Sequence, residues 1–322
     1  MRVIVTGGCG YVGSVLVPKL LDAGHTVRVL DIQWFGNYLK PHPRLKVFRY
    51  DIRNPELNTR KGICRADALI HLAGIANDPT GELDPKLTWE TNALATMHVV
   101  TNAYRVGVKH FIYASSGSVY GVSEEPEVTE RHLLFPLSEY NKTKMVAERV
   151  VRSYRDGMDV SIVRPATVCG WSPRMRLDVA VNAITMMALE KGHIEINGGE
   201  QYRPNIHIED MCDLYLWLLD NNPTFKGLEH LWSAGVYNAG FENLQIKEIA
   251  AMVAERLGVG VTALPTVDPR SYRVNSDRLL NAGFKPKKTV ANAIDELIAR
   301  YRAGELTNEE RWYNLKAMKK AA

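Results

Sequence analysis

The chain has 322 residues, of which 46% are hydrophobic and 24% are charged. That length suffices for one large hydrophobic core or two smaller ones, and we expect two domains. The 40 Lys and Arg residues nearly balance the 36 Asp and Glu residues, and a net charge of +4 is too weak to indicate a surface for nucleic acid or anionic membrane. Partners of these two kinds are therefore not expected.

No apolar run reaches the roughly 18 residues that a membrane span requires, and the N-terminus shows neither a basic leader nor a small-residue cleavage site. A cytoplasmic protein is therefore expected. The cysteines stand singly, without the close pairs typical of zinc sites, and we interpret them as reduced thiols; they are Cys9, Cys64, Cys169 and Cys212.

Short β-branched segments alternate with amphipathic segments through the first half of the chain, as expected of a parallel sheet with crossover helices. Strands are predicted at Arg2–Val5, Thr26–Leu30, Lys46–Phe48, Ala68–His71, His110–Tyr113 and Val160–Val163. Helices are predicted at Ser14–Ala23 and Thr88–Val106, each ending near a glycine. Right-handed crossovers then give an α/β fold with a Rossmann-type, doubly wound parallel sheet.

The pattern changes after Thr167, where helical segments dominate. They lie at Val179–Glu190, Met211–Leu219, Ile246–Leu257, Val290–Arg302 and Asn308–Lys320, with a turn at Gly198-Gly199. This half predicts a smaller, mixed α/β substrate lobe against the sheet. We therefore expect a Rossmann domain over residues 1–168, to which 205–240 return, and a second lobe over 169–204 and 241–322.

A glycine-rich segment, Thr6–Gly13, directly follows the first predicted strand and opens a helix. Gly7, Gly10 and Gly13 stand where tight turning and close helix packing exclude a Cβ, so a dinucleotide phosphate is expected at the helix N-terminus. Asp31 ends the second strand, where a carboxylate can accept hydrogen bonds from the ribose hydroxyls of adenosine. No Arg or Lys occurs from Ile32 to Leu39 to bind a 2′-phosphate, which favours NAD over NADP.

Tyr140 and Lys144 are four residues apart, so on a helix they share one face. A nearby ammonium and the positive nicotinamide ring would favour the phenolate, which can act as a base. A hydroxyl cluster that includes Ser116 and Ser118 follows the fifth strand, at the sheet edge where α/β proteins bind ligands. A serine there can hydrogen-bond the reacting oxygen beside Tyr140.

Together these motifs resemble the extended short-chain dehydrogenase/reductase family, in particular its NAD-dependent nucleotide-sugar epimerase/dehydratase branch, from Met1 to about Arg302. The family's TGGxGxxG, HLAG and YxxxK motifs match Thr6–Gly13, His71–Gly74 and Tyr140–Lys144. The resemblance implies that Ser116, Tyr140 and Lys144 are catalytic and makes His71 a packing residue. It implies that the cofactor is bound by Gly7, Gly10, Tyr11, Val12, Gly13, Asp31, Ile32, Asp51, Ile52, Leu72, Ala73, Gly74, Asn92, Ala114, Tyr140, Lys144 and Pro165.

The same resemblance extends to the second half. The segment that lines the nicotinamide matches Arg164–Gly170, with Thr167 in place of the usual asparagine. Arginines that bind the pyrophosphate of the sugar nucleotide match Arg203 and Arg270, with Arg273 as the alternative to Arg270. The implied substrate contacts are Ser116, Ser118, Thr167, Asn182, Arg203 and Arg270. His207, Glu209 and Asp210 match a helix-start motif, and no metal site is predicted.

The shared chemistry of the branch is oxidation of the sugar at C4, and neighbouring residues distinguish the reactions that follow. Dehydratases of the family carry Asp-Glu directly after the catalytic serine or threonine, whereas this chain has Gly117 and Ser118. We therefore expect a 4-epimerase, with a 4-dehydrogenase or 4-keto reductase as the alternative, followed by a 4,6-dehydratase and a non-catalytic NAD-binding protein. The expected partners are a nucleotide-diphosphate sugar and a second copy of the chain, which would pair through the helices of Thr88–Val106 and Tyr140–Tyr154.

Overall fold

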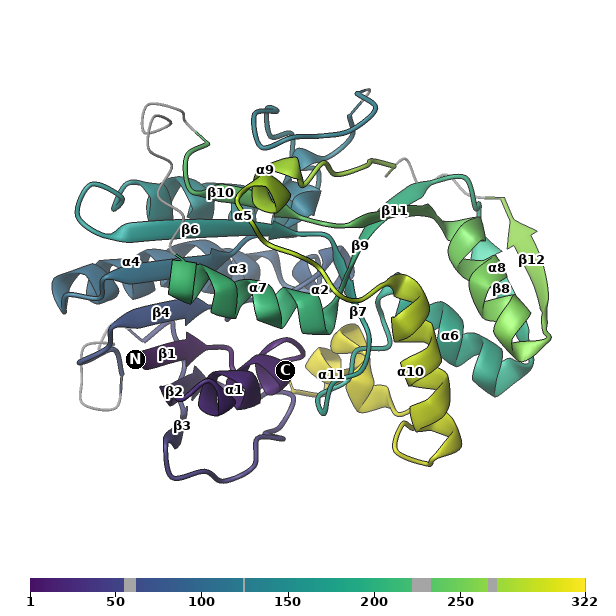
Figure 1. Ribbon diagram of the computed structural model, residues 1–322, viewed down its shortest axis with the longest axis horizontal. Coiled ribbons are helices and arrows are strands. Elements are labelled where there is room, and N and C mark those ends of the chain that lie inside the picture. Colours follow the sequence, from purple (N-terminus) through teal and green to yellow (C-terminus); the bar gives the residue numbers. More distant parts are fainter. Residues whose placement is uncertain (55–61, 124, 222–232, 266–270, 322) are drawn as a thin grey trace.

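The computed structural model describes residues 1–54, 62–123, 125–221, 233–265 and 271–321. Its large sheet has seven parallel strands in the order β3–β2–β1–β4–β5–β6–β10 (Figure 1). These strands are β1 Arg2–Thr6, β2 Thr26–Asp31, β3 Leu45–Arg49, β4 Ala68–His71, β5 His110–Ala114, β6 Asp159–Pro165 and β10 Val236–Ala239. The predicted fold class and all six predicted strands are confirmed. The seventh strand, β10, was not predicted, and its parallel pairing with β6 places it at the edge of the sheet.

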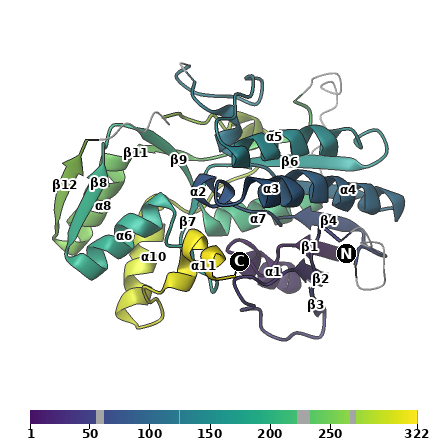
Figure 2. The same cartoon turned by 180° about the vertical axis from the view of Figure 1, so that it is seen from behind.

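Helices cover both faces of this sheet, as Figures 1 and 2 show from opposite sides. The helices α1 (Gly13–Asp22) and α7 (Ile208–Asn221) lie on one face, and α4 (Ala95–Arg105) and α5 (Glu139–Arg152) lie on the other. Successive side chains of β1 alternate between the faces: Val3 and Val5 join the core under α1 and α7, and Ile4 joins the core under α4 and α5. Burial on both sides explains why the central strands β1, β4 and β5 are mostly apolar.

The single helix predicted at Thr88–Val106 is instead three consecutive elements. Pro85–Trp89 forms α3, Glu90–Leu94 is a π-helical turn (η1), and α4 follows. The wider π turn contains Asn92, whose buried amide bonds both backbone groups of Ile75. A periodicity argument cannot detect this turn, because one wide turn shifts the apolar stripe only slightly.

The second lobe combines two small sheets with three helices. One sheet contains β7 (Thr167–Cys169), β9 (Tyr202–His207) and β11 (Glu242–Gln245), and the other pairs β8 (His193–Asn197) with β12 (Gly260–Leu264). Its apolar core is contributed by β8 and by the helices α6 (Ala180–Lys191), α8 (Ile246–Leu257) and α10 (Val290–Arg302). The turn predicted at Gly198-Gly199 separates β8 from β9, and both glycines have positive φ. The remaining short elements are α2 Asp78–Gly81, η2 Gly117–Tyr120 and α9 Asp277–Asn281.

The C-terminal segment differs from the helix predicted at Asn308–Lys320. A short 3-10 turn, η3 (Glu310–Trp312), comes first, Tyr313 is extended, and α11 covers only Asn314–Ala321. The break allows the Trp312 ring to pack into the core, with its centroid 5.6 Å from that of Tyr38. In both views α11 lies beside the beginning of α1 (Figures 1 and 2).

The predicted returning segment, 205–240, contains α7, which covers the large sheet, and β10, which extends it. The domain boundaries themselves stay a prediction. Within the five described ranges, no helix is long and apolar enough to cross a membrane. The same residues contain no group of three or more His, Cys, Asp or Glu side chains placed to hold a metal ion.

Candidate active site

A cavity of about 940 Å³ lies where the strands of the large sheet end. Its walls include residues that follow β1 through β6, which is the edge at which open α/β sheets bind ligands. The predicted residues on these walls are Gly7, Gly10, Tyr11, Val12, Gly13, Asp31, Ile32, Asp51, Ile52, Leu72, Ala73, Gly74, Ala114, Ser116, Ser118, Tyr140, Pro165, Thr167 and Arg203. Asn197, Gln201 and Ile246 from the second lobe line the same cavity. One continuous site therefore runs from the glycine loop to the second lobe.

The glycine loop leaves no room for side chains on its inner side. Gly7 has φ +73°, and a Cβ there would lie 2.6 Å from the backbone nitrogen of Ala73. A Cβ on Gly13 would lie 2.5 Å from the carbonyl oxygen of Gly8. Because α1 begins at Gly13, the loop presents the positive end of that helix to the cavity. This cradle fits the pyrophosphate of a dinucleotide.

Asp31 extends from the end of β2 toward this loop. Its Oδ2 accepts a hydrogen bond from the backbone N–H of Cys9 at 2.9 Å, and its Oδ1 accepts one from the N–H of Gln33 at 2.6 Å. Burial raises the pKa of Asp31, and these two bonds offset part of the rise. The carboxylate is thus held at the cavity wall, in the place expected for a ribose contact.

Tyr140 is at the beginning of α5, and Ser138 caps this helix by accepting a hydrogen bond from the N–H of Asn141 at 3.2 Å. Burial raises the pKa of Tyr140, and a hydrogen bond with Ser116 and the positive charge of Arg176 counteract that rise. The Oγ atoms of Ser116 and Ser118 are 2.6 Å apart, and Ser118 in turn donates to Asn141. The structure therefore brings Tyr140, Ser116 and Ser118 together at one wall.

Lys144 lies one turn further along α5, behind the cavity wall. It is only 5% exposed, and its Nζ donates a hydrogen bond to the carbonyl oxygen of Ala114 at 2.8 Å. Burial lowers the pKa of Lys144 to about 8, although the nearby carboxylate of Glu148 opposes this shift. The ammonium is thus fixed beside the wall formed by Ala114 and Gly74.

Two predicted residues support the site from inside the protein. His71 is fully buried between the hydroxyls of Thr6 and Thr96, which lie 2.5 and 2.9 Å from its ring nitrogens. Burial lowers the pKa of His71 to about 3, so the ring is neutral, in keeping with the packing role implied by the resemblance. Asn92 is off the cavity wall and holds the loop after β4 by its two bonds to Ile75.

Among the predicted substrate residues that the structure describes, Asn182 is not on the cavity wall. Asn182 is fully buried: its Oδ1 accepts from the N–H of Gly170, and its Nδ2 donates to the carbonyl oxygen of Arg176 at 2.9 Å. Because these two hydrogen bonds use the Asn182 amide on the backbone of the loop after β7, Asn182 holds the shape of that loop. Arg270 lies outside the described residues. The alternative, Arg273, stacks over Tyr202 and donates to the carbonyl oxygen of Pro126.

Two wall residues from the loop after β7, Arg174 and Arg176, were not predicted as site residues. Arg176 pairs with Asp178 at 2.9 Å, but its buried Nη2 has no hydrogen-bond partner among the described residues. Two closely spaced arginines in the sequence Pro-Arg-Met-Arg could have suggested an anion-binding loop, but only the fold shows that both side chains line the cavity.

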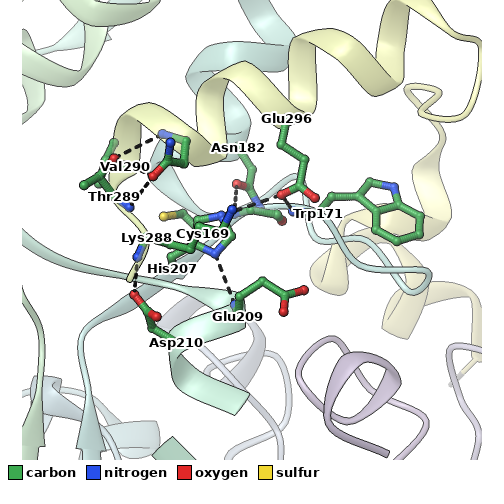
Figure 3. Close-up of polar contacts among 12 residues, drawn as sticks. Cys169, Trp171, Asn182, His207, Glu209, Asp210, Lys288, Thr289, Val290 and Glu296 are labelled. Carbon is green, nitrogen blue, oxygen red and sulfur yellow. Dashed lines mark hydrogen bonds and ion pairs between the residues drawn. The ribbon is translucent and has the colours of Figure 1, made fainter. Parts of the chain in front are cut away.

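The loop that carries these arginines is anchored by partly buried polar contacts (Figure 3). A carboxylate oxygen of Glu296 on α10 accepts from the N–H of Trp171 at 3.4 Å and lies 3.6 Å from Nε2 of His207. The Nδ1 of His207 accepts from the N–H of Glu209 at the beginning of α7. His207 therefore connects the loop, through Glu296, to α10 and, through the N–H of Glu209, to α7.

Comparison with known proteins agrees with this geometry. Residues 3–240 match the model of the NAD dependent epimerase/dehydratase family. The chain is 25% identical to a putative UDP-glucose 4-epimerase of Methanocaldococcus jannaschii, over 92% of this chain and 97% of that protein. It is 26% identical to UDP-glucuronic acid decarboxylase 1 of Arabidopsis thaliana, over 96% of this chain and 72% of the relative.

Among solved structures, the UDP-glucose 4-epimerase of Thermus thermophilus in complex with NAD has the same fold, with a TM-score of 0.79 and 24% identity, over 92% of this chain and 99% of that one. The family model covers most of the chain, and its match includes the glycine loop, Asp31 and the Tyr140–Lys144 pair. The chain belongs to the NAD-dependent epimerase/dehydratase family and is an enzyme of the extended short-chain dehydrogenase/reductase type, with NAD as its cofactor.

Proposed function

We propose that the chain is a nucleotide-sugar 4-epimerase that works through transient oxidation at C4 of the sugar. The residues around Ser116 support this reaction most directly. It lies beside Tyr140 on a cavity that also contains Asp31 and Arg203, and no acidic residue follows it in the chain at the next two positions. The site thus has the groups for oxidation and reduction at one carbon without an added acid and base for elimination.

In the proposed mechanism, Tyr140 takes the proton of the C4 hydroxyl as a base. Ser116 hydrogen-bonds the same oxygen as it becomes a carbonyl. NAD, which the glycine loop and Asp31 would hold, would supply the reversible hydride acceptance at C4, and inversion would follow from return of the hydride to the opposite face of the turned-over keto sugar. Tyr140 then gives its proton back to the oxygen. Lys144 keeps a positive charge beside this wall, which favours the phenolate.

Carboxylates near the cavity support the choice of epimerisation over dehydration. At the two positions where family dehydratases carry Asp-Glu, Gly117 has no side chain and Ser118 donates to Asn141. Asp78 accepts a hydrogen bond from Ser138 at 2.6 Å, and Asp178 is paired with Arg176. Each of these two carboxylates is therefore already engaged with a protein group.

For the substrate we propose a nucleoside-diphosphate hexose. Arg203 lines the second-lobe end of the cavity, and a guanidinium suits the oxygens of a pyrophosphate. The buried Nη2 of Arg176 is a donor for a sugar oxygen near Tyr140, whose pKa responds to the charge of Arg176. UDP-glucose and UDP-glucuronic acid are the first substrates to test, because the names of similar proteins include these two sugar nucleotides.

The test is incubation of the purified enzyme with UDP-, GDP-, CDP- and dTDP-sugars, with and without added NAD. NADH absorbance and product chromatography are followed together. Conversion to a C4 isomer without net NADH supports the epimerase. Stoichiometric NADH with a keto product would replace it with the alternative, a 4-dehydrogenase or 4-keto reductase. Turnover that survives in Tyr140→Phe would contradict both reactions.

We also propose that the enzyme is a homodimer that pairs through α4 and α5. Leu94, Met97 and Tyr104, on α4 and its preceding turn, are large apolar residues that remain 51%, 39% and 47% exposed. Burying such side chains against a second copy is favourable. Light scattering at micromolar concentration should give twice the mass of one chain, and a single-chain mass would refute the dimer.

A further inference from the structure

Arg174 is a buried cation with only neutral hydrogen-bond partners among the described residues. Its side chain is 1% exposed, and its Nη2 donates to Oδ1 of Asn314 at 2.6 Å. The guanidinium lies 4.0 Å from the centre of the Phe35 ring and also donates to the carbonyl oxygen of Met175. The Nε atom is buried without any hydrogen-bond partner. The carboxylates of Asp178 and Asp31 act on this buried charge without hydrogen-bonding it, so the guanidinium retains donor capacity for a further anion.

A bound anion can reach Arg174 from the cavity, because Arg174 lines it together with Asp31 and Phe35. The loop of Arg174 is also bonded directly to the glycine loop. Ser172 donates to the carbonyl oxygen of Tyr11 at 2.7 Å, and the Tyr11 hydroxyl donates to the carbonyl oxygen of Gly170 at 2.6 Å. Arg174 is therefore held next to the segment that cradles the cofactor phosphates.

We propose that Arg174 binds the pyrophosphate of NAD, so that a residue of the second lobe completes the cofactor site. The two negative charges of the pyrophosphate would then be stabilised by the Arg174 guanidinium and by the N-terminus of α1. The other anionic group that a dinucleotide could offer, the 2′-phosphate of NADP, would be repelled by the carboxylate of Asp31. This inference rests on the cofactor and is independent of the proposed reaction.

The C-terminal segment positions Arg174 and would keep the cofactor in place. Besides accepting from Arg174, Asn314 donates its backbone N–H to Asp178 at 3.2 Å, and the carbonyl oxygen of Trp312 accepts from the N–H of Leu177 at 2.9 Å. Tyr313, Asn314, Leu315 and Lys316 line the same cavity as the glycine loop. Asn314 is therefore a positioning residue for Arg174, and loss of its contact should speed the release of NAD.

The experiment compares the wild-type enzyme with Arg174→Met, Arg174→Lys and Asn314→Ala. Arg300→Met is the matched control, because Arg300 stacks on Trp171 of the same loop but is not on the cavity wall. Calorimetry on nucleotide-free enzyme gives the affinities for NAD, ADP-ribose, NADP and adenosine. Gel filtration of the NAD-loaded enzyme, followed by chromatography of the extracted nucleotide, gives the half-life of bound NAD.

Arg174→Met should weaken NAD and ADP-ribose by about 10- to 100-fold, the size of a charge-assisted hydrogen bond, and leave adenosine within about twofold. Asn314→Ala should shorten the half-life of bound NAD several-fold, and Arg300→Met should change neither quantity. An equal loss for adenosine, or a loss confined to NADP, would overturn the proposal. If Arg174→Met does not fold, Asn314→Ala decides: wild-type affinity for NAD together with wild-type retention of NAD in that variant would overturn the proposal.

Discussion

The ammonium group of Lys144 donates a hydrogen bond to the carbonyl oxygen of Ala114, and the two atoms are 2.8 Å apart. This contact connects α5 to the end of β5 and places a buried cation directly behind the cavity wall that contains Tyr140 and Ser116. Burial of that charge lowers the free energy of unfolding, as shown by the lowering of the pKa of Lys144 to about 8.

This cost should appear as a pH dependence of stability. Between about pH 8 and the unfolded value of about 10.5, the unfolded chain holds a proton on Lys144 that the folded chain has lost. The Lys144 contribution to the free energy of unfolding therefore rises with pH in that window. Urea unfolding of the nucleotide-free wild type and of Lys144→Met, from pH 7 to 10.5, should show this rise in their difference. A difference that is flat with pH would contradict the buried ammonium.

Tyr140→Phe should reduce kcat by about 100-fold or more, because the hydroxyl is the proposed base. The ring remains, so calorimetry should give an affinity for NAD within about twofold of the wild type. Ser116→Ala should lower kcat less, because it removes one hydrogen bond to the reacting oxygen and leaves the base in place. A Tyr140→Phe enzyme with wild-type kcat would exclude Tyr140 as the base.

Arg176 should control the acidic limb of the pH–rate profile. Its charge lowers the pKa of Tyr140, so Arg176→Met should raise that pKa further. Because the base must be deprotonated, the acidic limb of kcat should move to higher pH, by about one unit. Arg176→Lys retains the charge and serves as the control. The rate of reduction of bound NAD, measured by stopped flow from pH 5 to 10, gives the pKa of the acidic limb. The same pKa in Arg176→Met and the wild type would show that the charge of Arg176 does not act on Tyr140.

Asp31 should determine the choice between the two dinucleotides. Asp31→Ala removes the carboxylate that faces the ribose site, and the affinity for NAD should fall about tenfold. The same substitution removes the repulsion between the Asp31 carboxylate and the 2′-phosphate of NADP, so the ratio of NADP affinity to NAD affinity should rise. Calorimetric titration with both nucleotides measures this ratio, and a ratio equal to that of the wild type would be inconsistent with Asp31 as the selector.

The buried ion pair between Glu148 and Arg164 should dominate the electrostatic contribution to stability. The two side chains are 3% and 1% exposed and 2.7 Å apart. Glu148→Leu leaves Arg164 buried without its carboxylate and should cost about 3–5 kcal/mol in the free energy of unfolding. The exposed pair of Glu200 and Lys247 provides the control, since Glu200→Leu should cost at most about 1 kcal/mol. Urea unfolding at pH 7 measures both, and similar costs would contradict the burial argument.

Much of the fold and part of the candidate site could be predicted from local pattern. The strand period, the glycine loop before α1 and the four-residue spacing of Tyr140 and Lys144 are all properties of short segments. Asp31 belongs with them, because it ends a strand next to the glycine loop. Errors appeared where a local period was interrupted, at the π turn around Asn92 and at the extended residue Tyr313 that precedes α11.

The sequence by itself determined the fold class, the family and the cofactor, since each depends on contiguous motifs whose geometry the backbone sets locally. Only the tertiary structure decided which distant side chains meet. It turned Asn182 into a support for Gly170, placed Arg174 and Arg176 on the cavity and brought Asn314 to Arg174 from 140 positions away in the chain. Such contacts follow from long-range burial and from the need to satisfy buried polar groups, which no periodicity within one segment records.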